Sequence, residues 1–174
     1  SDPIPYFIAE GREKTGFRGT DMELARWALA AWQRTSGNAI RFEPAGESSA
    51  LVRLYWVEPV EGQYGEMESL VVGGRLGAAV YIRPDMDSLG ADISARASRD
   101  RLLRDTIVYL TCVHELGHVL GLAHTRDYRD IMYFFGYGGD IPNYFGRYRA
   151  EVRSRADIAK VSGLSAGDVT RLKS

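Results

Sequence analysis

Three histidines and a glutamate lie close together in one stretch of the sequence. Residues 114–124 read His-Glu-Leu-Gly-His-Val-Leu-Gly-Leu-Ala-His, and the chain has no other histidine. His114 and His118 are four positions apart, so on a helix they share one face and both imidazoles can reach one metal ion. Gly121 can adopt the left-handed conformation that ends a helix, which allows His124 to turn back towards the same ion. Three nitrogen ligands with an open fourth position are typical of catalytic zinc.

Glu115 gives the same stretch a candidate general base. It follows His114 directly, so it can reach a water on the metal without being a ligand. Zinc lowers the pKa of such a water to about 7, and Glu115 would accept its proton and pass it to the leaving nitrogen. Two other interpretations remain: ordinary histidines on a buried helix, or a zinc site without catalysis. The spacing argues against the first, and the presence of Glu115 argues against the second.

The surrounding sequence predicts the elements that would position these residues. Thr20 and Glu23 fit a capping box at the start of a helix, which Ser36-Gly37-Asn38 would end. A longer helix is predicted from Ala97 to Leu120, and it carries the first two histidines. The buried face of the early helix is expected to consist of Leu24, Ala28, Ala31 and Trp32. Strands are predicted at 4–9, 39–44, 50–57, 68–73 and 77–83, a short helix within 147–160, and a last helix after Ser165, which forms a second capping box with Asp168.

The composition is that of a globular protein, with 45% hydrophobic and 26% charged residues. The net charge of −1 provides no basic field for nucleic acid, and no apolar run is long enough for a membrane span. Cys112 is the only cysteine, which excludes an internal disulfide and a zinc site of several thiolates. Because Cys112 lies two positions before His114, it points to the other side of the helix, and we expect a small buried hydrophobic residue.

The motif and its surroundings resemble the metzincin zinc peptidases, whose signature is H-E-x-x-H-x-x-G-x-x-H followed by a turn that contains methionine. Here Asp130-Ile131-Met132-Tyr133 supplies that turn, and its short distance from the third histidine resembles the matrixin branch. Leu164-Ser165-Ala166-Gly167-Asp168-Val169 is similar to the start of the last matrixin helix. Ala31-Trp32 followed by Ile40-Arg41-Phe42 is similar to the early part of the family in layout. Together the matches span nearly the whole chain.

This resemblance implies an α+β, zincin-like fold. It has a twisted mixed sheet of about five strands, an active-site helix, an early helix and a C-terminal helix, arranged as two lobes that flank a cleft. We expect one catalytic domain over residues 1–174, with an N-terminal lobe of residues 1–121 and a C-terminal lobe of residues 122–174. Met132 would lie beneath the three histidines as an apolar floor rather than as a ligand.

The implied function is that of a zinc-dependent endopeptidase, with one catalytic zinc ion on His114, His118 and His124 and with Glu115 as the general base. Its partners would be peptide or protein substrates, with neither nucleic acid nor a membrane span, and we expect a monomer. The first residues have no signal-peptide pattern, so a signal or pro-segment is absent or already removed, and we expect a secreted or extracytoplasmic protein. The alternatives are a non-catalytic binding or scaffold protein on this fold and a zinc hydrolase of non-peptide amides.

The chain also departs from the matrixin pattern. No histidine remains for the second, structural zinc ion, and the calcium-binding loops are not recognisable, so Asp85 and Asp87 are interpreted as an acidic turn. Phe134 stands where matrixins usually have proline. The 32 residues from Met132 to Leu164 are more than the usual matrixin stretch.

The segment after the methionine is rich in aromatic residues, which predicts that several of them are buried or line a cleft. Tyr133, Phe135 and Tyr137 are the candidates for a substrate pocket beside the zinc. The alternative is that they pack beneath the active site. If one of them borders the pocket, the enzyme would prefer a hydrophobic residue immediately after the cleaved bond.

Overall fold

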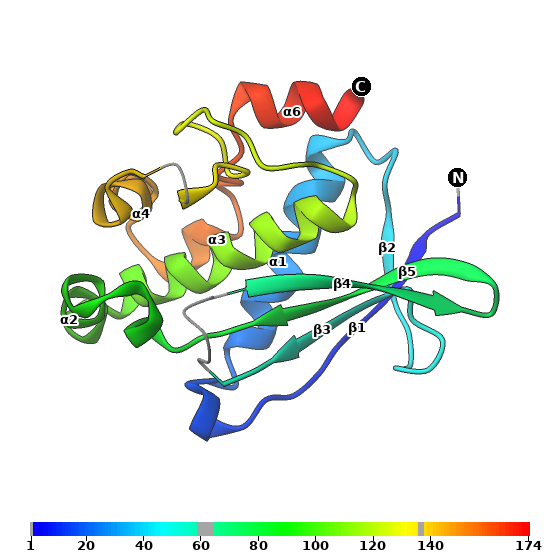
Figure 1. Ribbon diagram of the computed structural model, residues 1–174, viewed down its shortest axis with the longest axis horizontal. Helices are drawn as coiled ribbons and strands as arrows, with labels where there is room; N and C mark the ends of the chain where they lie inside the picture. Colours follow the sequence, from blue (N-terminus) through cyan, green and yellow to red (C-terminus); the bar gives the residue numbers. More distant parts are fainter. Residues whose placement is uncertain (1, 59–64, 136–137) are drawn as a thin grey trace.

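A mixed sheet forms one layer of the protein, and helices cover one of its faces (Figure 1). The structure is a computed structural model, and it describes residues 2–58, 65–135 and 138–174. The strand order is β2-β1-β3-β5-β4, so the predicted α+β fold with a five-stranded mixed sheet is confirmed. The strands are β1 (Ile4–Ile8), β2 (Phe42–Pro44), β3 (Val52–Trp56), β4 (Gly65–Val72) and β5 (Arg75–Ile82).

The sheet is parallel except at its β4 edge. β1 pairs with β2 and β3, and β3 pairs with β5, all in parallel register. β4 and β5 form an antiparallel hairpin through Gly73 and Gly74, whose φ angles of +56° and +81° suit glycine. Both strands are longer than the sequence predicted. In β3 the buried residues are Val52, Leu54 and Trp56, which alternate with the half-buried Arg53 and Tyr55.

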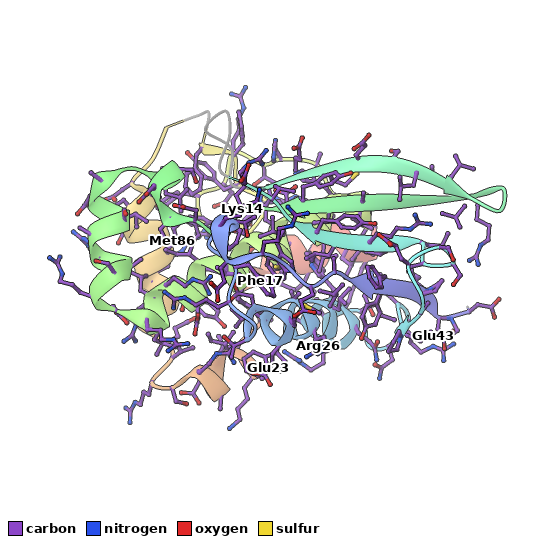
Figure 2. The ribbon with its side chains drawn as sticks, turned by 90° about the horizontal axis from the view of Figure 1, so that it is seen from below. Lys14, Phe17, Glu23, Arg26, Glu43 and Met86 are labelled. Carbon is purple, nitrogen blue, oxygen red and sulfur yellow. The ribbon has the colours of Figure 1, made fainter. Side chains whose placement is uncertain are left out.

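Helix α1 (Asp21–Thr35) packs on α3 (Arg101–Val119), which lies across the sheet (Figure 1). Glu23 and Arg26 lie on the exposed side of α1 (Figure 2). The predicted apolar face of α1 is confirmed, because four residues at helical spacing have no exposed surface: Leu24, Ala28, Ala31 and Trp32.

The capping box predicted at Thr20 is wrong. Thr20 has helical backbone angles, and its side chain makes no capping hydrogen bond. The neighbouring Asp21 is buried and pairs with the buried guanidinium of Arg104 on α3. Glu23 pairs with Arg155 instead of turning back to the helix start. Ion pairs with distant parts of the chain therefore replace the local cap.

The long helix predicted from Ala97 to Leu120 is two helices. α2 (Ala91–Arg99) and α3 are separated at Asp100, whose backbone is extended and whose side chain accepts the Leu103 N–H at 3.1 Å. Asp100 is therefore the N-cap of α3, a role that short acidic residues favour. The short helix predicted within 147–160 is α5 (Arg155–Ile158), and the end of α4 (Ile141–Arg149) also lies in that segment. The structure also has α6 (Ala166–Lys173), η1 (Glu13–Thr15) and η2 (Met86–Leu89).

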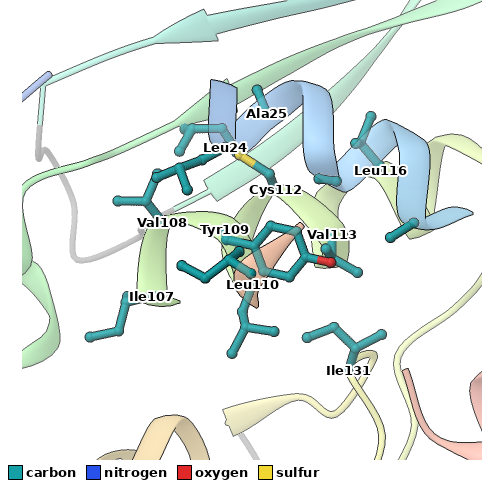
Figure 3. Close-up of a cluster of buried hydrophobic side chains, with 14 of the residues drawn as sticks. Leu24, Ala25, Ile107, Val108, Tyr109, Leu110, Cys112, Val113, Leu116 and Ile131 are labelled. Carbon is teal, nitrogen blue, oxygen red and sulfur yellow. The ribbon is translucent and has the colours of Figure 1, made fainter. Parts of the chain in front are cut away.

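The contact between α1 and α3 fixes the helix that carries the motif. Cys112 is fully buried beside Leu24 of α1, as predicted for a small hydrophobic residue (Figure 3). Trp32 is fully buried, and its Nε1 donates to the Val113 carbonyl at 2.9 Å. Burying one large apolar side chain contributes about 1.5–3 kcal/mol. Of the helices in the described ranges, none is long and apolar enough to cross a membrane.

Candidate metal centre

The three histidines of the motif converge. His114 and His118 lie on α3, and the chain after α3 brings His124 to them. One ring nitrogen from each residue lies within 4.8 Å of the other two, and the Nε2 atoms of His118 and His124 are 3.1 Å apart. In residues 2–58, 65–135 and 138–174 this is the one group of three such side chains that could hold a metal ion.

Backbone carbonyls fix the tautomers of two of the rings. His114 Nδ1 lies 2.6 Å from the Ile131 carbonyl oxygen, and His118 Nδ1 lies 2.8 Å from that of Leu122. A carbonyl only accepts hydrogen bonds, so each Nδ1 carries a proton, and in the neutral ring the lone pair is then on Nε2. Burial lowers the pKa of His114 to about 4, which keeps this ring neutral at neutral pH. Neutral imidazoles with a free Nε2 are donors that zinc binds, so these residues fit the metal.

Gly121 makes the turn after α3. Its φ is +95°, as the sequence predicted, and its N–H donates to the His118 carbonyl at 3.0 Å. The chain then returns to place His124, whose ring stacks on Phe134 with centroids 4.7 Å apart and an interplanar angle of 14°. His124 is therefore positioned by an aromatic side chain from beyond the motif.

Glu115 is buried beside the histidines, with its Oε2 4.0 Å from His114 Nε2. Burial raises the pKa of Glu115 to about 7, the charge of Glu66 adds to this rise, and Arg83 opposes it. Arg83 is itself buried and donates to Glu66 at 3.2 Å. A charge pair from the start of β4 and the end of β5 therefore acts on the carboxyl group of Glu115.

The Met132 turn (residues 130–133) packs against α3. Met132 has no exposed surface, and its sulfur lies against Gly117: a Cβ atom on Gly117 would be 2.5 Å from Met132 Sδ and 3.1 Å from Trp32 Cζ2. The Thr125 N–H donates to the Met132 carbonyl at 2.9 Å, which joins the turn to the segment after the third histidine. Glycine at position 117 therefore allows this close contact.

Helix α6 holds the Met132 turn from another side. The buried carboxylate of Asp168 accepts the Ile131 N–H at 2.8 Å, and the Ser165 side chain caps the helix by accepting the Asp168 N–H at 3.0 Å. The capping box predicted at Ser165 is confirmed. Asp130 accepts the Thr125 hydroxyl at 2.7 Å. The capping carboxylate of α6 thus also supports the turn next to the histidines.

Comparison with known families decides the class of this site. A family model described as matrixin matches residues 3–139. The chain belongs to the matrixin family. Membership confirms the resemblance predicted from the motif, and it implies zinc as the metal and a metallopeptidase as the class of enzyme. No curated protein matches the chain.

The solved structures that are similar to this matrixin have few residues in common with it. Archaemetzincin from Methanopyrus kandleri has a TM-score of 0.52 and 12% identity, over 98% of this chain and 93% of that one. Myroilysin has a TM-score of 0.41 and 14% identity, over 98% of this chain and 81% of that one. The likeness to archaemetzincin supports the fold.

The aromatic residues after Met132 occupy different surroundings in this matrixin. Tyr133 is buried, and its hydroxyl donates to a backbone carbonyl of the same segment. Phe135 is half-buried, with its ring centroid 4.9 Å from that of Tyr144. Tyr137 lies outside the described residues. Phe134 keeps 42% of its surface exposed beside the third histidine.

No sequence pattern indicates that several residues near the candidate metal centre belong to it. Glu66 and Arg83 come from a hairpin far from the motif, so their charges near Glu115 follow from the sheet order. In the sequence, Phe134 stood out only because matrixins usually have proline at this position. Asp85 accepts the Asp87 N–H at 2.7 Å and caps the start of η2, which is the acidic turn interpreted from the sequence.

Proposed function

We propose that this matrixin is a zinc-dependent endopeptidase in which His114, His118 and His124 bind the metal through Nε2. Glu115 is the general base. The observation that carries the proposal is the convergence of three ring nitrogens within 4.8 Å beside a buried carboxyl group. Two of the rings have Nδ1 on a carbonyl, which leaves Nε2 for the metal.

The mechanism follows from the position and environment of Glu115. When bound, zinc supplies Lewis acidity, which polarises the scissile carbonyl and makes water more acidic. Glu115 accepts a proton from the attacking water and transfers it to the leaving nitrogen. Burial makes the carboxylate of Glu115 a stronger base than that of an exposed glutamate, which favours the first of these steps.

The edge strand β4 supports an endopeptidase, because an extended peptide can add to such an edge as a further strand. β4 is the outermost strand on its side of the sheet. Its second residue, Glu66, lies close enough to Glu115 for its charge to raise the pKa of that carboxyl group. A peptide paired along β4 would therefore run up to the general base. Pairing through the backbone accepts varied sequences and leaves selectivity to the side-chain pockets.

Phe134 is the residue that we assign to the pocket for the side chain after the cleaved bond. Its ring stacks on His124 and is 42% exposed, so it offers an apolar surface next to the metal ligands. Phe134 was not among the pocket candidates from the sequence; Tyr133 and Phe135, which were, have most of their surface in the aromatic packing behind it. The substrate would accordingly carry a hydrophobic residue at this position.

Replacement of Glu115 by glutamine tests the function. Glu115→Gln keeps the shape of the side chain and removes the base, so it should retain one zinc ion per chain and lose nearly all peptide cleavage. Zinc is measured by elemental analysis, and cleavage is measured on denatured casein and on a diverse peptide library, with and without a chelator. Glu151→Gln changes an exposed acid far from the motif and serves as the control.

Three outcomes would contradict the proposal. Cleavage by Glu115→Gln at the wild-type rate would remove Glu115 as the general base. Cleavage that persists after complete removal of metal would refute zinc catalysis. A wild-type protein that binds zinc but cleaves no peptide in the library would favour a scaffold or a hydrolase of other amides.

A further inference from the structure

Tyr144 of α4 reaches the carbonyl that orients the first metal ligand. Its single hydroxyl proton is shared between the Asp130 carbonyl, at 2.8 Å, and the Ile131 carbonyl, at 3.2 Å. The Ile131 oxygen is the same atom that accepts His114 Nδ1–H at 2.6 Å. Tyr144 is only 4% exposed, so water does not compete for these bonds.

The backbone of Ile131 is thus held through both of its hydrogen-bonding groups. Its N–H donates to Asp168 of α6, and its carbonyl accepts from Tyr144 of α4 as well as from His114 of α3. Three helices therefore meet at one residue of the Met132 turn. A carbonyl with two donors in fixed directions has little freedom to rotate, and the imidazole bonded to it shares that restriction.

Helix α4 is itself firmly placed. Asp140 caps its start by accepting the Asn143 N–H at 3.1 Å. The ring of Tyr144 packs against Phe135 and Phe145, with centroid distances of 4.9 and 5.3 Å. The guanidinium of Arg147 lies 4.6 Å from the centroid of the Tyr144 ring. The Tyr144 hydroxyl therefore contacts the Met132 turn from a side chain that has little conformational freedom.

We propose that Tyr144 is a positioning residue for the metal centre, acting through the Ile131 carbonyl on the direction of His114. This inference rests on the proposed function, because it assumes that His114 is a zinc ligand. It also gives a role to α4, which lies between the Met132 turn and α6 and braces the turn that supports the ligand.

Loss of the Tyr144 hydroxyl alone should reduce the zinc affinity more than it reduces the stability of the fold. In Tyr144→Phe the ring and its packing remain. The Asp130 carbonyl still accepts the Tyr133 N–H at 3.2 Å, and the Ile131 carbonyl still accepts from His114. Neither carbonyl is left without a donor, so a large loss of stability is not expected. Zinc affinity should fall by about tenfold, which is typical when a residue that orients a ligand is removed.

Tyr148→Phe is the matched control. Tyr148 lies on the same helix and is also 4% exposed, and its hydroxyl donates to the Val161 carbonyl at 2.6 Å, away from the Met132 turn. The experiment uses the full chain as wild type and both variants. It measures the zinc dissociation constant by competition with a chelator, the visible spectrum of the cobalt-substituted proteins, and thermal unfolding of the metal-free proteins.

A positioning role requires that Tyr144→Phe weakens zinc binding and alters the cobalt spectrum while Tyr148→Phe matches the wild type in both. The thermal unfolding of the metal-free variants should be similar. Equal zinc affinities for the two variants, whether both unchanged or both reduced, would overturn the inference and leave the proposed function intact. A wild-type chain that binds no zinc would instead overturn the proposed function, and the inference with it.

Discussion

His114 and His118 lie on a helix, whereas His124 lies on the chain that has left it, and the protein supports the two locations by different means. Each helical ring donates Nδ1–H to a backbone carbonyl, at 2.6 and 2.8 Å. The third ring is supported by stacking on Phe134, with 4.7 Å between centroids. His114 is buried, and His124 is exposed.

The difference separates a preformed pair of candidate ligands, His114 and His118, from an adjustable third one, His124. A hydrogen bond to a carbonyl fixes both the tautomer and the direction in which Nε2 points. Stacking fixes the plane of a ring and leaves it freer to turn within that plane. The helical pair should therefore determine whether a metal binds, and the third histidine should determine how tightly it is held.

Removal of one helical ligand should have the largest effect on the centre. His118→Ala should lose most of its zinc, because it removes a ligand whose direction is fixed before the metal arrives. His124→Ala should keep weak but measurable binding on the helical pair. Elemental analysis after desalting measures both, and circular dichroism verifies the fold. Full zinc occupancy in His118→Ala would exclude this residue as a ligand, and equal losses in the two variants would refute the comparison.

Replacement of Gly117 by alanine tests how closely the Met132 turn must pack on the helical pair. The added Cβ would lie 2.5 Å from Met132 Sδ and 3.1 Å from Trp32 Cζ2, so the turn or the helix must shift. Overpacking of this kind costs about 1–3 kcal/mol of unfolding free energy. Denaturant unfolding of the metal-free protein measures it.

Gly146→Ala is the control for that substitution. Gly146 also lies within a helix, but no other group lies within 4 Å of a Cβ atom built there. Alanine at this site should stabilise the helix by up to about 1 kcal/mol. If Gly117→Ala proved as stable as Gly146→Ala, the contact between the turn and α3 would be looser than the distances indicate.

Truncation of Phe134 should have the smallest effect on stability, within about 0.5 kcal/mol, since a large part of the side chain faces solvent. Phe134→Ala should weaken zinc binding modestly and reduce the preference for a hydrophobic residue after the cleaved bond. Phe134→Leu keeps an apolar surface without a ring to stack, so it should restore the cleavage preference and leave the zinc affinity reduced. Cleavage-site profiling of a peptide library separates the two roles, and unchanged profiles in both variants would exclude Phe134 from the pocket.

The sequence predicted the features that depend on residues close together in the chain. The spacing of His114 and His118, the left-handed turn at Gly121 and the cap at Ser165 are all local patterns, and each could be derived from helix geometry. The five strands followed from alternation and turn residues. Their order could not be derived from those signals, because pairing partners are chosen by packing.

The errors and omissions in the prediction share a cause, which is competition from distant residues. Thr20 has a favourable local sequence for a cap, but the buried pair between Asp21 and Arg104 determines the start of the helix. Asp168 could be recognised as a capping acid, yet its bond to the Ile131 N–H joins residues 37 positions apart. The periodicity of a sequence does not indicate contacts between residues so far apart in the chain.

The bond between Asp168 and Ile131 also bears on the order in which the candidate metal centre is completed during synthesis. The ribosome produces α3 and the Met132 turn well before residue 168, and amino-terminal parts of a chain fold first. Until Ser165 and Asp168 leave the ribosome, the Ile131 N–H lacks its buried acceptor and the turn lacks this support for His114. The support for His114 is therefore completed only when α6, which follows the histidines by some forty residues, has joined the fold.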